Sequence, residues 1–205
     1  MERRELLKII AVLTGGAMVG GDVFLSGCKT STKKGEGLLS ADDIALLNEV
    51  GDTIIPVTNT PGAKAAKVGE FMNVYVSDCY RADQQKAFTE GLAVLDKACE
   101  KQFSKNFMAL TPAERNQVIA ALEPEAKTFN EQIKEKEQIA RDAARQEIKE
   151  FIGAPLHYYS MIKQLTLLGY FTSEIGMKEA LRYLPVPGKY DGAFPYKKGD
   201  KAWAI

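Results

Sequence analysis

A single histidine, His157, is available for acid–base or metal chemistry in this sequence. Histidine catalysis needs a positioned carboxylate or nucleophile, and a metal site needs further ligands at suitable spacing. The chain has no Gly-x-Ser-x-Gly elbow, no Gly-x-Gly-x-x-Gly fingerprint and no Cys-x-x-Cys pair. We therefore favour a structural histidine and predict no catalytic, cofactor-binding or metal-binding residue. An enzyme that uses His157 with nearby carboxylates is kept as an alternative.

The cysteines offer thiol chemistry at three separate positions. Cys79 and Cys99 each fall on an apolar helical stripe, where a buried free thiol is common. An oxidising compartment would also permit a disulfide between them. We favour free, buried thiols, and the disulfide stays open as the alternative.

The third cysteine, Cys28, ends a segment that resembles an export signal. Arg3 and Arg4 resemble a twin-arginine motif, which directs folded proteins across the membrane. The apolar stretch at 9–19 is shorter than the roughly 20 residues that span a bilayer. Leu-Ser-Gly-Cys at 25–28 resembles a lipobox, in which the cysteine becomes lipidated. We predict a lipid-anchored protein on the periplasmic side of the cell envelope.

Composition and charge bound the rest of the chain. Lys+Arg and Asp+Glu both number 27, so the 205-residue chain has no net charge. No global field therefore exists to attract nucleic acid, and we predict no nucleic-acid partner. The predicted organisation is a twin-arginine-type lipoprotein signal at 1–28, a flexible tether at 29–38 and one helical domain at 39–205.

Helix signals recur through the predicted domain. Ser40 with Asp43, and Thr111-Pro112 with Glu114, are typical helix starts, and Pro56 should end the first helix. Apolar side chains recur at helical spacing in the segments between these signals. These stripes comprise Leu47, Val50 and Ile54; Val68, Phe71, Met72, Tyr75 and Cys79; Phe88, Leu92, Leu95 and Cys99; and Leu156, Tyr159, Leu165 and Leu168.

The remaining segments predict less compact structure. Residues 125–150 are dense in charge and should form a long surface helix with a thin apolar seam that includes Ile148. A short helix is predicted from Ile175 to Tyr183. The tail beyond it is rich in Gly, Pro, Lys and aromatic residues and should lie extended over the domain or a partner. We predict an all-α helical bundle with an irregular C-terminal arm.

Two segments have compositions that a helix does not require: the first is polar and contains two prolines, and the second is polar and aromatic. The first is 52–64, Asp-Thr-Ile-Ile-Pro-Val-Thr-Asn-Thr-Pro-Gly-Ala-Lys. The second is 169–176, Gly-Tyr-Phe-Thr-Ser-Glu-Ile-Gly, followed by 183–190, Tyr-Leu-Pro-Val-Pro-Gly-Lys-Tyr. Aromatic side chains bury a large area at low entropic cost, so such segments often anchor interfaces. They could equally cover the core of the domain itself, and both interpretations stay open.

The same segments resemble the gluconate 2-dehydrogenase subunit 3 family. The resemblance covers most of residues 40–195, and its two longer motifs are specific only in combination. It is carried by Asp52-Thr53-Ile54-Ile55-Pro56, Thr60-Pro61-Gly62-Ala63, Phe71, Thr166, Gly169-Tyr170-Phe171-Thr172-Ser173, Pro187-Gly188 and Tyr190.

The resemblance implies a non-catalytic accessory subunit of a membrane-associated dehydrogenase. Its large partner would resemble glucose-methanol-choline oxidoreductases, hold FAD and oxidise a sugar, a sugar acid or an alcohol. Electrons would pass on to a cytochrome c or a quinone. The small subunit would bind no cofactor and would assist export and stability of the flavoprotein.

Partner contact is expected from the residues that carry the resemblance. The expected contact residues are Pro61, Gly62, Tyr170, Phe171, Thr172 and Tyr190. The alternative is a free-standing envelope lipoprotein that binds a ligand or another envelope protein. That alternative would require a closed, ligand-sized pocket within the domain.

Overall fold

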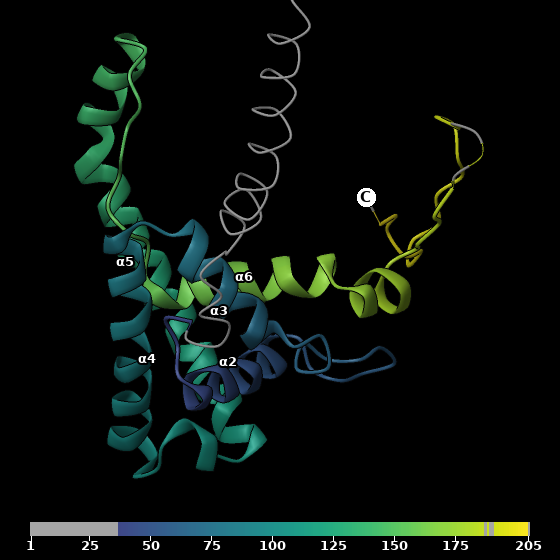
Figure 1. The fold of residues 1–205 in the computed structure, drawn as a ribbon, viewed down its shortest axis with the longest axis horizontal. Coiled ribbons are helices and arrows are strands. Elements are labelled where there is room, and N and C mark those ends of the chain that lie inside the picture. The colour runs from purple at the N-terminus through teal and green to yellow at the C-terminus, as the bar shows by residue number, and fades with distance from the viewer. Residues whose placement is uncertain (1–36, 187, 189–190, 205) are drawn as a thin grey trace, which may run out of the picture. The chain divides into compact units, whose positions relative to one another are not determined.

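The computed structural model describes residues 37–186, 188 and 191–204 (Figure 1). These residues confirm the all-α prediction, because their regular structure is helical apart from one isolated β-bridge. The predicted export residues Arg3, Arg4 and Cys28 lie outside the described part of the chain. The helices are α2 (Ala41–Ile54), α3 (Val68–Cys79), α4 (Ala82–Phe103), α5 (Pro112–Gln146) and α6 (Tyr158–Thr172), with short turns η1 (Phe107–Ala109) and η2 (Gly176–Ala180).

The two predicted helix starts are confirmed. The Ser40 hydroxyl accepts from the Asp43 backbone N–H at 3.1 Å, and the Asp43 carboxylate accepts from the Ser40 N–H at 3.0 Å. Thr111 and Glu114 make the same reciprocal pair at the start of α5, where Pro112 occupies the first helical position. Each pair satisfies backbone donors that would otherwise lack partners at a helix start.

Helix α6 is the central element of the bundle. It contacts α2, α3, α4 and α5 (Figure 1). Its inward face is fully covered, with Ile162, Leu165, Thr166 and Tyr170 all at most 2% exposed. Thr166 is tolerated there because its hydroxyl donates to the Ile162 carbonyl at 2.9 Å. Contacts with these four helices therefore fix the position of α6 and of the motif residues on it.

Helix α5 is longer than the sequence indicates, because it continues through Pro124. The proline removes one backbone donor, but Val118, Leu122 and Ala126 bury one continuous face on both sides of it. The predicted surface helix is thus the second half of α5. Its seam stops earlier than predicted: the helix ends at Gln146, and Ile148 is 95% exposed with a φ of 54°.

The thiols of Cys79 and Cys99 are free, as favoured from the sequence. Cys99 is buried in the core, and burial raises the pKa of its thiol to about 11. Cys79 is exposed, so its predicted burial is wrong; it is the last residue of α3, where the covered face of that helix ends. Across the described ranges, no helix has both the length and the apolar character that a bilayer crossing requires.

The chain beyond α6 is irregular, as predicted. The expected helix at 175–183 is reduced to the wide turn η2. Gly176 permits this turn, because a Cβ there would lie 1.9 Å from the Tyr170 carbonyl oxygen. The tail then folds back on itself: the Arg182 N–H donates to the Ala202 carbonyl at 2.8 Å, and the Ala204 N–H donates to the Arg182 carbonyl at 3.0 Å.

Candidate functional site

The segments 52–64 and 169–176 meet in space at Pro61 and Tyr170, which are 109 residues apart in the sequence. The Tyr170 hydroxyl donates to the Pro61 carbonyl oxygen at 2.6 Å. The Tyr170 ring is 1% exposed and lies among core side chains of the bundle. The end of α6 therefore holds the loop 55–63 in place through one buried side chain.

The loop is also held by its own backbone. The Ala63 N–H donates to the Ile55 carbonyl at 2.9 Å, and the Lys64 N–H donates to the Asp52 carboxylate at 3.2 Å. Gly62 lies inside this bend, where a Cβ would come within 2.3 Å of Asp52 Oδ1 and 2.9 Å of the Val57 nitrogen. The Asp-Thr-Ile-Ile-Pro and Thr-Pro-Gly-Ala motifs are thus two sides of one tight loop.

The Gly-Tyr-Phe-Thr-Ser motif has internal roles as well. A Cβ on Gly169 would lie 2.6 Å from the Phe71 ring, so the glycine lets α6 approach α3 closely. The Ser173 hydroxyl donates to the Tyr170 carbonyl at 2.7 Å and accepts from the Gly176 N–H at 3.0 Å. Much of the motif is therefore explained by packing and by the end of α6.

The structure separates the predicted contact residues into two groups. Tyr170 and Gly62 are buried within this chain, which corrects their prediction as partner contacts. Pro61 is half-buried, Phe171 is 39% exposed and Thr172 is exposed, so these three stay predicted contacts. The remaining predicted contact, residue 190, lies outside the described part of the chain.

Exposed apolar side chains occur on both elements that the Tyr170–Pro61 bond joins. Val57 on the loop is 67% exposed, and Leu167 on α6 is 40% exposed. Leu167 and Phe171 share one face of α6, because residues four apart on a helix are neighbours. Sequence reasoning missed Val57 and Leu167, because apolar residues show no sign of exposure before the packing is known. We name Val57, Leu167, Phe171 and Thr172 the loop–α6 surface.

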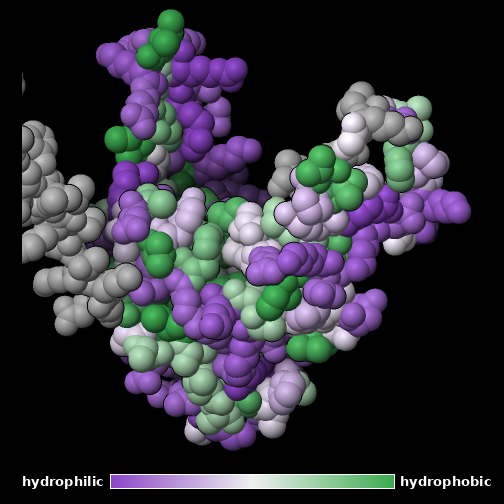
Figure 2. Space-filling model, turned by 45° about the vertical axis from the view of Figure 1, so that its right-hand side comes forward, coloured by the Kyte–Doolittle hydropathy of each residue, from purple (hydrophilic) through white to green (hydrophobic). Residues whose placement is uncertain are grey.

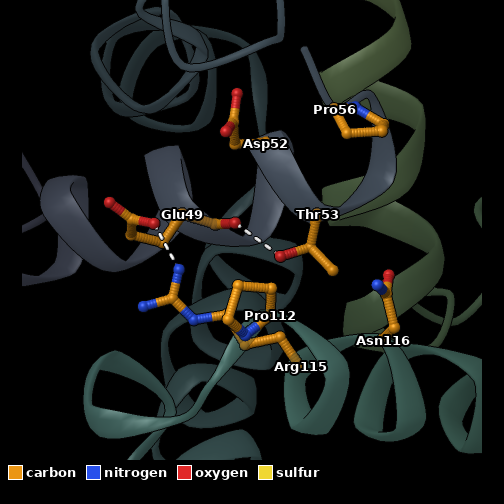
Figure 3. A pocket seen from close by; sticks show the side chains of 7 residues that line it. All are labelled: Glu49, Asp52, Thr53, Pro56, Pro112, Arg115 and Asn116. Atoms are coloured by element: carbon orange, nitrogen blue, oxygen red, sulfur yellow. Dashed lines mark hydrogen bonds and ion pairs between the residues drawn. The ribbon is translucent and has the colours of Figure 1, made fainter. Parts of the chain in front are cut away.

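A hollow of about 180 Å³ lies beside the loop between α2 and α5 (Figure 3). Its charged groups are paired: Glu49 accepts from both Lys64 and Arg115, and Arg115 also donates to the Met108 carbonyl at 3.0 Å. This arrangement joins α2 to α5 through the Glu49–Arg115 pair. The lining residues are Glu49, Asp52, Thr53, Pro56, Pro112, Arg115 and Asn116.

We expect Glu49→Gln to lower the free energy of unfolding by about 1–3 kcal/mol at neutral pH, because Arg115 loses a charged partner. The hydrogen bond from Lys64, with Arg115 beside it, lowers the pKa of the Glu49 carboxyl. A carboxyl with a lowered folded-state pKa stabilises the fold above its unfolded pKa, and this contribution is lost as pH falls through the folded pKa. Urea unfolding at a series of pH values should therefore show the variant and the parent converging in acid.

Glu90→Gln is the matched control for this prediction. Glu90 faces only Lys86, at 3.9 Å, and both side chains are largely exposed. Exposed pairs of this kind contribute little, so the control should unfold like the parent at every pH. Equal effects of the two substitutions would contradict a structural role for the Glu49 pair.

His157 has a structural position, as favoured from the sequence. It caps the start of α6, where its Nδ1 accepts from the Tyr159 N–H at 3.3 Å. Its ring packs on Phe129 and Tyr158, and burial lowers its pKa although Glu125 lies 3.9 Å away. Among the described residues, no three His, Cys, Asp or Glu side chains come close enough to hold a metal ion.

Comparison of the sequence with known protein families gives a match that includes these segments. The sequence model of gluconate 2-dehydrogenase subunit 3 matches residues 41–188. The chain belongs to the gluconate 2-dehydrogenase subunit 3 family. The match begins at the first residue of α2 and includes both the loop and α6, so the loop–α6 surface lies within the family's shared domain. No curated protein and no solved structure matches the chain.

Proposed function

We propose that this chain is the non-catalytic small subunit of a membrane-associated, FAD-dependent dehydrogenase of sugars, sugar acids or alcohols. The family match over residues 41–188 carries this proposal. The family is named for a subunit of a dehydrogenase, and the match includes the loop and the helix that expose apolar side chains. In this proposal the large subunit holds FAD and performs the oxidation, and a cytochrome c or a quinone accepts the electrons.

The small subunit would assist the flavoprotein in two ways. First, exposed apolar side chains of the loop–α6 surface would be covered by the large subunit, which stabilises both chains. Second, the twin arginines at Arg3 and Arg4 would direct the assembled pair to export. Twin-arginine export moves folded proteins, and a flavin must be inserted before its protein crosses the membrane. Lipidation of Cys28 would then keep the complex at the envelope.

Replacement of both arginines by lysine tests the export role. We expect Arg3→Lys with Arg4→Lys to leave the large subunit and its flavin in the cytoplasmic fraction, because the receptor reads the arginine pair. Cell fractionation with flavin fluorescence measures this outcome. Lys33→Arg with Lys34→Arg is the matched control, with two conservative changes in the predicted tether, and should leave export intact. A flavoprotein that reaches the envelope with the Arg3/Arg4 variant would refute export by this chain.

A further inference from the structure

The C-terminal arm comprises the described residues 181–186, 188 and 191–204, and its two ends meet at Arg182. The guanidinium carbon of Arg182 lies 4.7 Å from the centre of the Trp203 ring and 5.4 Å from that of Phe194. Its Nη2 is 3.9 Å from the Asp200 carboxylate, and its backbone pairs with the residues on either side of Trp203. The tail therefore returns to the start of the arm.

This arm exposes large apolar and aromatic side chains. Val186 and Tyr196 are 77% and 78% exposed, which is far more than core packing would leave. Figure 2 shows hydrophobic residues beside hydrophilic ones on the protruding part of the molecule at the upper right, which contains the arm. The apolar and aromatic side chains that the arm exposes are Tyr183, Leu184, Val186, Phe194, Tyr196 and Trp203.

The same arm is basic, although the whole chain is neutral. Its described residues include four basic side chains, at 182, 197, 198 and 201, against acidic side chains at 191 and 200. Asp200 already faces Arg182, and Lys201 donates to the Glu179 carbonyl. Lys197 and Lys198 are both exposed, next to Tyr196, the most exposed aromatic side chain among the described residues.

Two observations favour a lipid surface over a protein as the partner of this arm. Lysine is depleted in protein–protein interfaces, whereas aromatic side chains mixed with lysine are typical of the bilayer interface. In addition, the family match ends at residue 188, so most of the arm lies outside the domain that family members share. We propose that the arm binds an anionic lipid surface, with its aromatic side chains among the headgroups and Lys197 and Lys198 facing lipid phosphates.

Trp203 is the only tryptophan of the chain and reports directly on this arm. The experiment uses the full chain with Cys28→Ser, which removes acylation, and vesicles of phosphatidylcholine with or without phosphatidylglycerol. We expect a blue shift of Trp203 emission and quenching by brominated phosphatidylglycerol, both reversed by salt. Quenching requires contact of the arm with lipid, so vesicle binding by other residues alone would not produce it.

The charge requirement is tested by Lys197→Gln with Lys198→Gln. Each lysine near an anionic surface strengthens binding about fivefold, so the double variant should need about 25-fold more lipid for half-maximal quenching. Lys134→Gln with Lys136→Gln removes the same charge from exposed positions on α5 and should match the parent. Absence of quenching with anionic vesicles, or equal weakening by the α5 control, would overturn the proposal.

A protein partner gives a different result in the same assay. A Trp203 shift with purified flavoprotein and none with vesicles would show that the arm docks on protein, and would also overturn the proposal. This outcome is distinguishable from failure of the proposed function. Lipid binding by the arm and complex formation by the loop–α6 surface use separate residues and separate measurements.

Discussion

Tyr170→Ala should lower the free energy of unfolding by about 3–5 kcal/mol, and Tyr170→Phe by about 1–2 kcal/mol. The alanine variant leaves a cavity in a core that is packed from four sides by helices. The phenylalanine variant keeps the ring but leaves the Pro61 carbonyl without its hydrogen-bond donor. Urea unfolding measures both changes, and hydrogen exchange of the 55–63 amides should rise in both variants.

Tyr183→Phe is the matched control for the hydroxyl group. Tyr183 is 44% exposed, so loss of its hydroxyl should leave stability and loop exchange unchanged. The interpretation of Tyr170 as the side chain that holds the loop predicts a local effect at 55–63 in addition to the global one. A Tyr170→Phe protein with parental exchange in that loop would contradict this interpretation.

Val57→Asp and Phe171→Asp should each weaken binding of the flavoprotein by about 30-fold or more, the effect expected when an interface hot spot is lost. A carboxylate at either position would be buried without a partner in the complex, yet it would be solvated in the free chain. Pull-down with purified large subunit measures the affinity. Thermal unfolding of the free variants separates loss of binding from loss of folding.

Ile139→Asp provides the control for a charge placed on an apolar surface position. Ile139 is 84% exposed on the far half of α5, outside the loop–α6 surface. The substitution should leave binding of the flavoprotein unchanged. Equal losses from all three substitutions would indicate a non-specific effect, and tolerance of both Val57→Asp and Phe171→Asp would exclude the loop–α6 surface as the docking site.

Local signals made most of the helices predictable. Ser40 with Asp43, and Thr111 with Glu114, act over a few residues, so a capping pair in the sequence is also a capping pair in the fold. The continuation of α5 through Pro124 was not predictable in the same way. It depends on the burial of side chains on both sides of the proline, which outweighs the lost backbone hydrogen bond. The exposure of Ile148 depends likewise on where α5 ends, which the helical spacing of its seam does not reveal.

The candidate site depended on contacts between distant parts of the chain. Tyr170 and Phe171 are adjacent aromatic residues, yet Tyr170 is buried and Phe171 is exposed. The bundle and the loop at Pro61 cover only one side of α6, and Pro61 is 109 residues from Tyr170 in the sequence, so no local signal distinguishes the two rings. The Glu49–Arg115 pair spans 66 residues and left no local signal. The family motifs located the right segments, but only the fold shows which side chains serve the core and which face solvent.

The most direct test of the proposed small-subunit role is purification of the full chain from envelopes of cells that also produce its large subunit. The account predicts that a flavin-containing protein co-purifies with the chain and that Ile139→Asp retains it, whereas Phe171→Asp loses it. A chain that purifies alone, while the flavoprotein is fully exported and active in cells that lack the chain, would contradict the account.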